Sequence, residues 1–171
     1  MDKIVIKQNQ LKQFSLLLLS IIMVVSSVFV FFINMPIFGI TFVSKIIGAA
    51  GIIFFGAASI YIIKCFIKPK AVLVIDRNGI TDNSSAVSIG FIPWHDIKSV
   101  YIKDVLNESF ICIDVENIEE KLKGLSSFKK NMIKRNLKTG APPVSITLGS
   151  TSYKPEKVLE IIKNYKEVYN Q

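Results

Sequence analysis

Few residues in this chain have the types and the spacing that catalysis or metal binding requires. His95 is the single histidine, and its neighbour Asp96 is expected on the opposite face of a strand, so we predict no acid–base pair. Cys112 lies between Ile111 and Ile113, without a basic neighbour that would lower its pKa and make it a nucleophile. One histidine cannot build a histidine-rich metal site. We therefore predict no catalytic residue, no bound metal and no cofactor.

The other residue types that often mark a site have structural explanations here. Cys65 and Cys112 sit in different settings, which predicts two buried thiols and no disulfide. The clustered glycines fall inside the apolar run 46–63 and so do not form a phosphate-binding loop. Trp94 is typical of a core or strand-end aromatic, and stacking on a ligand is the alternative.

One segment stands above this background because it is strongly basic. Residues 127–140 read SFKKNMIKRNLKTG, which predicts an amphipathic helix capped by Ser126 or Ser127. The expected buried stripe consists of Phe128, Met132, Ile133 and Leu137. The candidate membrane-surface contacts are Lys129, Lys130, Lys134, Arg135 and Lys138. Each Lys or Arg near an anionic leaflet gains roughly 1 kcal/mol, so this helix can lie on lipid headgroups; a solvated charged face is the alternative.

Two long apolar runs dominate the first part of the chain. Phe14–Ile33 and Ile46–Ile63 contain no charged residue. Each has about the 18–20 residues that a helix needs to cross a hydrocarbon layer of roughly 30 Å. We therefore predict an N-terminal segment (1–13), a transmembrane helical hairpin (14–67) and a polar domain (71–171).

Lysines flank the two runs and predict the orientation of the hairpin. The flanking lysines are Lys3, Lys7 and Lys12 before the first run and Lys64, Lys68 and Lys70 after the second. The positive-inside rule then places both termini and the polar domain in the cytoplasm, in a multi-pass protein of the cell membrane. A cleaved signal peptide is the alternative for the first run, but that run is too long and lacks a small-x-small cleavage site. The absence of charge within the runs argues against a transporter.

The basic charge is concentrated beside the apolar runs. Of 21 basic and 13 acidic residues, seven basic and one acidic residue lie in residues 1–70, which leaves 14 basic and 12 acidic residues for the remainder. The net charge of +8 is therefore explained by lysines that flank a membrane, and no nucleic-acid partner is expected. The predicted partners are the lipid bilayer, anionic lipid headgroups and an unknown protein.

Small residues recur at a spacing of seven within both runs. The pairs are Ser20 with Ser27, Ala49 with Gly56, and Ala50 with Ala57. Small residues on one helix face allow close approach of helix backbones in lipid. The spacing predicts packing of the two helices within one chain, or alternatively the seam of a homo-oligomer.

The polar domain reads first as a series of short strands. Asp76-Arg77-Asn78-Gly79 supplies a tight turn, because Asn and Gly tolerate a positive φ, and Leu106-Asn107-Glu108 supplies a loop. The predicted strands are 71–76, one that begins at Ile80, 88–94, 97–105, 110–115 and 144–148.

Helical signals then interrupt and close this series. Asn117 is expected to cap a short helix that ends at Gly124, and the basic helix follows. Pro155 opens a final helix. Its apolar stripe is Val158, Leu159, Ile162, Tyr165 and Tyr169. This order predicts an α+β domain with a curved antiparallel sheet or small barrel, an inserted helical segment and a closing C-terminal helix.

Two short motifs resemble a known family. VLVIDRNGI followed by GFIPWHDIKSVYI resembles the first strands of bacterial pleckstrin-homology-like domains, with a Trp-x-Asp-Ile pattern at Trp94, Asp96 and Ile97. Nearly the whole chain resembles a group of small, poorly characterised bacterial proteins with two membrane spans, this domain, a Lys-rich helical insertion and a final helix. The resemblance implies a pleckstrin-homology-like fold on a membrane hairpin. The helical stretch Asn117–Lys138 departs from a minimal pattern of this fold, and the group is not tied to a reaction.

These observations favour a non-enzymatic membrane protein. The leading hypothesis is a cytoplasmic pleckstrin-homology-like module that binds a protein partner or the anionic membrane surface. The alternative is a structural or immunity-type membrane component that acts through its hairpin. An enzyme is the third hypothesis, and a deep polar pocket lined by converging ionisable groups would favour it.

Overall fold

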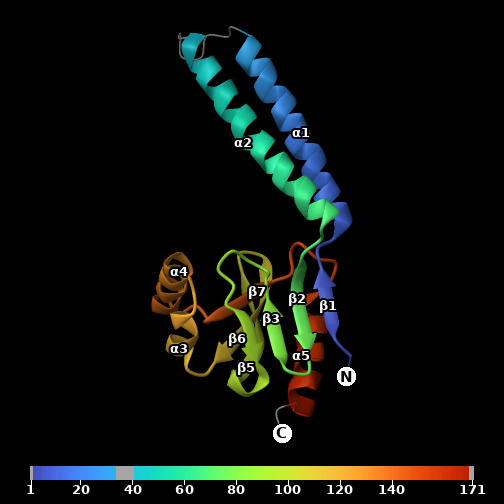
Figure 1. The fold of residues 1–171 in the computed structure, drawn as a ribbon, viewed down its shortest axis with the longest axis vertical. Helices are drawn as coiled ribbons and strands as arrows, with labels where there is room; N and C mark the ends of the chain where they lie inside the picture. Colours follow the sequence, from blue (N-terminus) through green and yellow to red (C-terminus); the bar gives the residue numbers. More distant parts are fainter. Residues whose placement is uncertain (1, 34–40, 170–171) are drawn as a thin grey trace. The chain divides into compact units, whose positions relative to one another are not determined.

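The computed structural model describes residues 2–33 and 41–169, which form two compact units (Figure 1). One unit is Asn9–Lys70, and the other combines Met1–Gln8 with Ala71–Gln171. The layout is mixed α+β, with two apolar helices, antiparallel strands and a C-terminal helix, as the sequence predicted. The expected N-terminal segment 1–13 is divided between the two units.

The first unit is a pair of long helices, α1 (Gln10–Phe32) and α2 (Thr41–Ile67). Asn9 caps α1, since its side chain accepts hydrogen bonds from the backbone N–H groups of Leu11 and Lys12 at 2.8 and 3.3 Å. By length and composition both helices can cross a membrane. Most of their large apolar side chains are exposed, unlike those of a core helix in a soluble domain.

Small polar and glycine residues form the seam between α1 and α2. Ser20 and Ser27 are buried there, as predicted, and the hydroxyl oxygens of Ser20 and Ser59 lie 2.9 Å apart. A Cβ added at Gly48 would come within 2.7 Å of the Phe31 backbone. The seam therefore depends on close backbone approach.

Of the small-residue pairs predicted on the second helix, Ala50 with Ala57 lies outside this seam, and so does Gly56 of the other pair. Ala50 and Ala57 are exposed, and a Cβ added at Gly56 would meet nothing within 4 Å. The contacting face of α2 instead carries Gly48 and Gly51, because these positions leave room for Phe31 and Ser27 of α1.

Replacing Gly48 by alanine should therefore weaken the hairpin by about 1–3 kcal/mol, the usual cost of overpacking. Gly56→Ala is the matched control and should change the stability little, because its new methyl group meets open space. An SDS titration of the full chain in mixed micelles, followed by circular dichroism, measures both. Equal effects of the two substitutions would contradict this account of the seam.

The second unit contains two antiparallel sheets. The first has the order β1-β2-β3-β4, with β1 (Ile4–Lys7), β2 (Ala71–Asp76), β3 (Gly79–Asp82) and β4 (Gly90–Pro93). The second has the order β5-β6-β7, with β5 (Ile97–Val105), β6 (Glu108–Val115) and β7 (Val144–Thr147). Each predicted strand after residue 70 is present, with bounds close to those expected.

β1 is the strand that the sequence analysis did not place. It pairs antiparallel with β2, with Ile4 opposite Ile75 and Ile6 opposite Leu73. Ile6 is fully buried, so the first residues of the chain complete the sheet of the polar unit.

Ile6→Ala should cost about 2–5 kcal/mol of unfolding free energy, because it leaves a cavity in the core. The neighbouring Val5 is 38% exposed, so Val5→Ala should cost less than about 1 kcal/mol. Urea unfolding of the full chain in detergent, followed by the fluorescence of Trp94, the single tryptophan, compares them. Two equally small losses would show that β1 is not part of the cooperative unit.

A short 3₁₀ turn, Trp94–Asp96, separates β4 from β5. Trp94 is buried, and its indole N–H donates a 2.9 Å hydrogen bond to the carbonyl oxygen of Asp76. Its ring centroid lies 6.1 Å from that of Tyr165 in the last helix. Trp94 is therefore a core aromatic that links the end of β2 to the C-terminal helix.

The C-terminal helix α5 (Pro155–Tyr169) packs on the core formed by both sheets. Val158, Ile162 and Tyr165 are buried as predicted, and the Tyr165 hydroxyl donates to the carbonyl oxygen of Asp2. Lys166 Nζ donates to the carbonyl oxygen of Lys98 at 2.7 Å, on the edge strand β5.

The predicted helical insertion is α3 (Ile118–Lys123) followed by α4 (Ser127–Lys138), between β6 and β7. Figure 1 shows these two helices together on one side of the sheets, apart from α5. Asn117 precedes α3 in a left-handed conformation and makes no side-chain cap, so that predicted cap is wrong. Ser126 caps α4 by accepting from the Lys129 backbone N–H.

Candidate functional site

The structure divides the five basic residues of α4 into two groups. Lys129 points into the domain, where its Nζ donates a 3.0 Å hydrogen bond to the carbonyl oxygen of Ser88. The Nζ atom of Lys134 lies 3.3 Å from the carboxylate Oε2 of Glu119 in α3. Lys129 therefore attaches the insertion to the β3–β4 loop, whereas Lys134 joins its two helices to each other. The remaining three, Lys130, Arg135 and Lys138, have no ion pair within the described residues.

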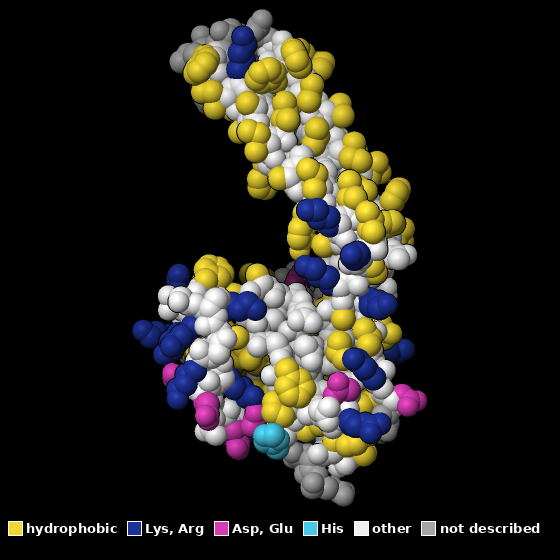
Figure 2. Space-filling view, in the orientation of Figure 1, with side chains coloured by type: hydrophobic (Ala, Val, Ile, Leu, Met, Phe, Trp, Pro, Cys, Tyr) yellow, Lys and Arg dark blue, Asp and Glu magenta, His cyan; other side chains and the backbone are white. Residues whose placement is uncertain are grey.

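The exposed face of α4 carries an aromatic residue beside Arg135 and Lys138. Phe128 is 65% exposed, so its predicted place in the buried stripe is wrong. Ile133 is buried and Lys129 half-buried, and these two residues set the side of α4 that packs on the domain. Phe128 and Arg135 are seven residues apart and so share the opposite side. Figure 2 shows Lys and Arg side chains gathered over α3 and α4.

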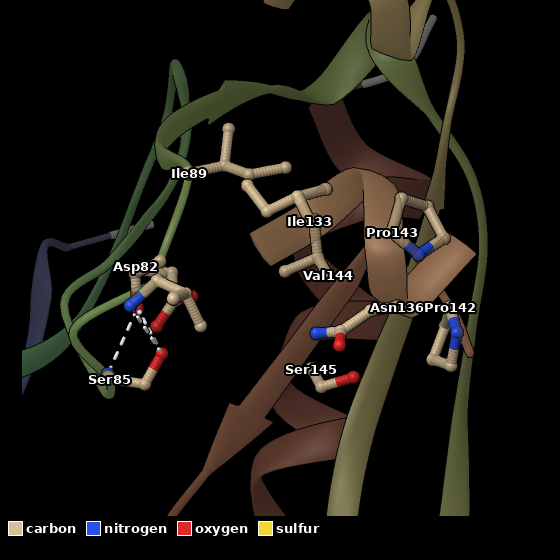
Figure 3. Close-up of a pocket in the computed structure, with 11 residues that line it drawn as sticks. Asp82, Ser85, Ile89, Ile133, Asn136, Pro142, Pro143, Val144 and Ser145 are labelled. Carbon is tan, nitrogen blue, oxygen red and sulfur yellow. Dashed lines mark hydrogen bonds between the residues drawn. The ribbon is translucent and has the colours of Figure 1, made fainter. Parts of the chain in front are cut away.

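A small polar pocket lies where α4 meets the loop between β3 and β4. Asp82 and Ser85 line one side, and Asn136 of α4 and Ser145 of β7 line the other (Figure 3). Its full lining is Asp82, Ser85, Val87, Ser88, Ile89, Ile133, Asn136, Pro142, Pro143, Val144 and Ser145. The cavity measures about 40 Å³. We call it the Asp82 pocket.

Hydrogen bonds fix the loop that forms one wall of the Asp82 pocket. Asp82 Oδ1 accepts from the Ser84 backbone N–H at 2.8 Å, which is an Asx turn. The Ser85 backbone N–H donates to Ser88 Oγ at 3.0 Å. Ser84 Oγ accepts from the Thr147 backbone N–H at 3.2 Å. The loop is thereby attached to β7 of the other sheet.

Asp82 is the buried ionisable group of this pocket. Asp82 is 1% exposed, and burial raises the pKa of its carboxyl. The Ser84 backbone N–H, the nearby Ser84 and Ser88 hydroxyls and the charge of Lys129 lower that pKa and partly offset the effect of burial. Oδ2 has no hydrogen-bond partner among the described residues.

The residues first considered for chemistry lie elsewhere. His95 is 80% exposed, and its Nε2 lies 3.3 Å from Asp96 Oδ1, so the expectation that the two side chains point apart is wrong. The reason is that they stand in a 3₁₀ turn and not on a strand. Asp96 also pairs with Lys121 of α3 at 2.5 Å. Cys112 is buried, and burial raises the pKa of its thiol, which disfavours the thiolate.

The Asp82 pocket was missed by the sequence analysis. The run Asp82-Asn83-Ser84-Ser85 signals an Asx turn, and it was interpreted as a loop. Nothing in the spacing indicates that α4 and β7, more than 40 residues later in the sequence, close over this loop. Among the described residues, no three His, Cys, Asp or Glu side chains gather as metal ligands. The arrangement suits hydrogen bonding to a small guest.

Comparisons with known proteins add no name to this geometry. No protein family, curated protein or solved structure matches the chain.

The raised pKa of Asp82 predicts a pH-dependent stability. The Asp82 carboxyl binds a proton more tightly in the folded state than in the unfolded state. Protonation of Asp82 therefore stabilises the folded state, and this contribution is fully present below the ordinary pKa of 3.8. It is lost as the pH rises through the folded-state pKa. Asp82→Asn keeps an acceptor for Ser84 and removes the ionisation. The free energy of unfolding of the wild type, relative to this variant, should therefore fall with rising pH by at most about 1.4 kcal/mol per pH unit.

Urea titrations of the full chain between pH 4 and 8, followed by Trp94 fluorescence, measure this difference. Asp76→Asn is the matched control, because Asp76 also accepts from a backbone N–H two residues on, that of Asn78 at 2.9 Å, outside the pocket. If the free energy of unfolding of the wild type minus that of Asp82→Asn stays constant, or rises with pH, the raised pKa of Asp82 is contradicted.

Proposed function

We propose that this chain is a two-span membrane protein whose polar unit binds the anionic surface of the membrane through the exposed face of α4. The observation that carries the proposal is the combination of Phe128 with Arg135 and Lys138 on a face that the domain leaves uncovered. An aromatic group flanked by cations suits the interface between headgroups and acyl chains. Lys129 and Lys134 contribute to the position of α4 and not to this contact.

The connectivity supports a polar unit on one side of the membrane. β1 precedes α1 and β2 follows α2, and these strands pair with each other. Their pairing requires both ends of the hairpin to lie on the same side. The flanking lysines favour the cytoplasmic side for both, where the leaflet is anionic.

The arrangement of the polar unit supports a pleckstrin-homology-like fold. Its features are two antiparallel sheets, of four and three strands, and a C-terminal helix that packs on the core from both. Two features are additional to a minimal domain of this kind: the first strand is separated from the others by the hairpin, and α3 and α4 are inserted before β7. The proposed contact lies on this insertion.

The expected affinity is modest without the hairpin. Two cations, Arg135 and Lys138, at roughly 1 kcal/mol each, with one partly inserted aromatic ring, give a weak contact for a free domain. The connections between the units are short, at Gln8–Asn9 and Lys68–Lys70. Because they make binding intramolecular, a weak contact is sufficient.

The test places a reporter on α4 of the full chain. Asn131, which is exposed on the same face, is changed to cysteine and labelled with an environment-sensitive fluorophore, after replacement of Cys65 and Cys112 by alanine. The labelled protein is placed in nanodiscs of phosphatidylcholine alone or with phosphatidylglycerol. We expect lipids with nitroxide-labelled headgroups to quench the fluorophore in the anionic discs. High salt should reduce this quenching, because it screens the attraction between the cations and the lipid.

Charge reversal supplies the control. Arg135→Glu with Lys138→Glu should abolish the quenching. Lys157→Glu with Lys163→Glu makes the same change of charge on exposed positions of α5 and should leave it intact. Equal quenching in neutral and anionic discs, or no response to the α4 substitutions, would contradict the proposal and favour a protein partner for this face.

A further inference from the structure

The face of α2 that lies outside the seam with α1 carries an apolar groove. Its lining residues recur at spacings of three, four and seven, which places them on one side of the helix. They are Ala50, Ile53, Phe54, Ala57, Ala58 and Tyr61, around a space of about 660 Å³. The large side chains of Ile53, Phe54 and Tyr61 are exposed, and the alanines leave a hollow between them. The groove therefore uses small residues that the seam leaves over.

A basic pocket continues this groove at the end of α2. It measures about 440 Å³, and it is lined by Tyr61, which it shares with the groove, and by Lys64, Cys65, Ile67, Lys68 and Lys70. Lys70 Nζ lies 6.0 Å from the centroid of the Tyr61 ring, within the range of a cation–π contact. None of the three lysines has an ion pair within the described residues, and residues 9–70 contain no Asp or Glu. The pocket thus has three cations and no anion from its own helices.

The dimensions of the groove and the pocket match one lipid molecule in one leaflet. From Ala50 to Tyr61 the helix rises by about 16 Å, at roughly 1.5 Å per residue. This rise is about half of a hydrocarbon layer of roughly 30 Å. Lys64 follows within one further turn, so the cations begin where the apolar groove ends. Figure 2 shows hydrophobic side chains along the helical hairpin and Lys or Arg side chains gathered at the end where α2 leads into β2.

We infer that the groove and the basic pocket together bind one anionic phospholipid, and we call them the α2 lipid site. The phosphodiester group lies among Lys64, Lys68 and Lys70, as in basic pockets that bind anionic headgroups beside membrane helices. One acyl chain lies along Ala50 and Ala57. The lipid supplies the negative charge that residues 9–70 lack.

A second copy of the chain fits this face less well than a lipid does. Two copies have the same orientation in a membrane, so a symmetric contact through the groove would bring their basic pockets together. Lys64 and Lys68 of one copy would then approach the same residues of the other without a carboxylate between them, and like charges repel. An anionic phospholipid has the opposite charge and the same apolar length.

The inference goes beyond the proposed function and does not depend on it, because the α2 lipid site contains no residue of α4. The proposed contact of α4 concerns the charged surface of the membrane, whereas this site selects a single lipid that stays with the hairpin. Loss of one leaves the other unchanged.

Native mass spectrometry of the full chain in a non-ionic detergent measures the binding of single lipids. The chain is titrated with phosphatidylglycerol and with phosphatidylcholine of the same acyl chains. We expect the first phosphatidylglycerol to bind roughly tenfold more tightly than phosphatidylcholine, since three cations face its phosphate. Lys64→Gln with Lys68→Gln and Lys70→Gln should abolish this preference.

The matched control removes the same charge elsewhere. Lys154→Gln with Lys157→Gln and Lys163→Gln changes exposed positions in α5 and just before it, and the preference for phosphatidylglycerol should remain. Glycerophosphoglycerol, the headgroup without acyl chains, should show no binding, because the apolar groove contributes nothing to its affinity. This arm separates a phospholipid from a free phosphate compound.

A second pair of variants tests the apolar groove. Ala57→Phe fills the hollow and should weaken phosphatidylglycerol binding roughly fivefold, as overpacking does. Ile60→Phe is the control, because Ile60 is exposed and does not line the groove, and it should change the affinity little. Four results would each overturn the inference: equal binding of the two lipids, equal loss in both lysine variants, binding of the headgroup alone, or no effect of Ala57→Phe. A dimer mass without bound lipid would assign the face to a second copy and overturn it as well.

Discussion

The antiparallel pairing of β1 with β2 is the constraint on which the rest of the structure depends. These strands lie on either side of the helical hairpin in sequence, and yet Ile4, Val5 and Ile6 pair with Ile75, Val74 and Leu73. The chain must therefore leave the polar unit and return to it before the first sheet is complete. This requirement accounts for a paired α1 and α2, for short connections between the units, and for a core that includes Ile6.

The inserted helices depend on the sheets in a different way. α4 is held by the Lys129 hydrogen bond to the β3–β4 loop and by buried Ile133, and Lys134 joins it to α3. Lys129 is thus committed to the fold and Lys134 is paired within the insertion, so the uncovered face has fewer unpaired charges than the sequence suggests. That face nevertheless gains an exposed aromatic ring. The inner side closes the Asp82 pocket, and the outer side is available to a surface.

Much of the fold could be predicted because its signals are local. Turn chemistry at Asp76–Gly79 and period-two alternation gave β2 and β5 with their observed bounds, and the stripe of Val158, Ile162 and Tyr165 gave the buried face of α5. The parts that were missed depend on distant contacts. β1 has only four residues next to a long apolar helix, and its pairing partner lies beyond the hairpin. The rotation of α4 that exposes Phe128 and the closing of the Asp82 pocket are likewise set by tertiary packing.

The pairing of β1 with β2 in the membrane-bound chain is the claim that one measurement tests most directly. Val5 and Val74 are opposite each other, and paired residues in antiparallel strands have Cα atoms about 4.5–5.5 Å apart, within the range of a disulfide. After replacement of the native cysteines by alanine, Val5→Cys with Val74→Cys should form an intramolecular disulfide on mild oxidation in membranes. Val5→Cys with Thr81→Cys, which places the second thiol on β3, should not. Equal yields from the two pairs, or no disulfide from either, would contradict a sheet that is closed across the hairpin.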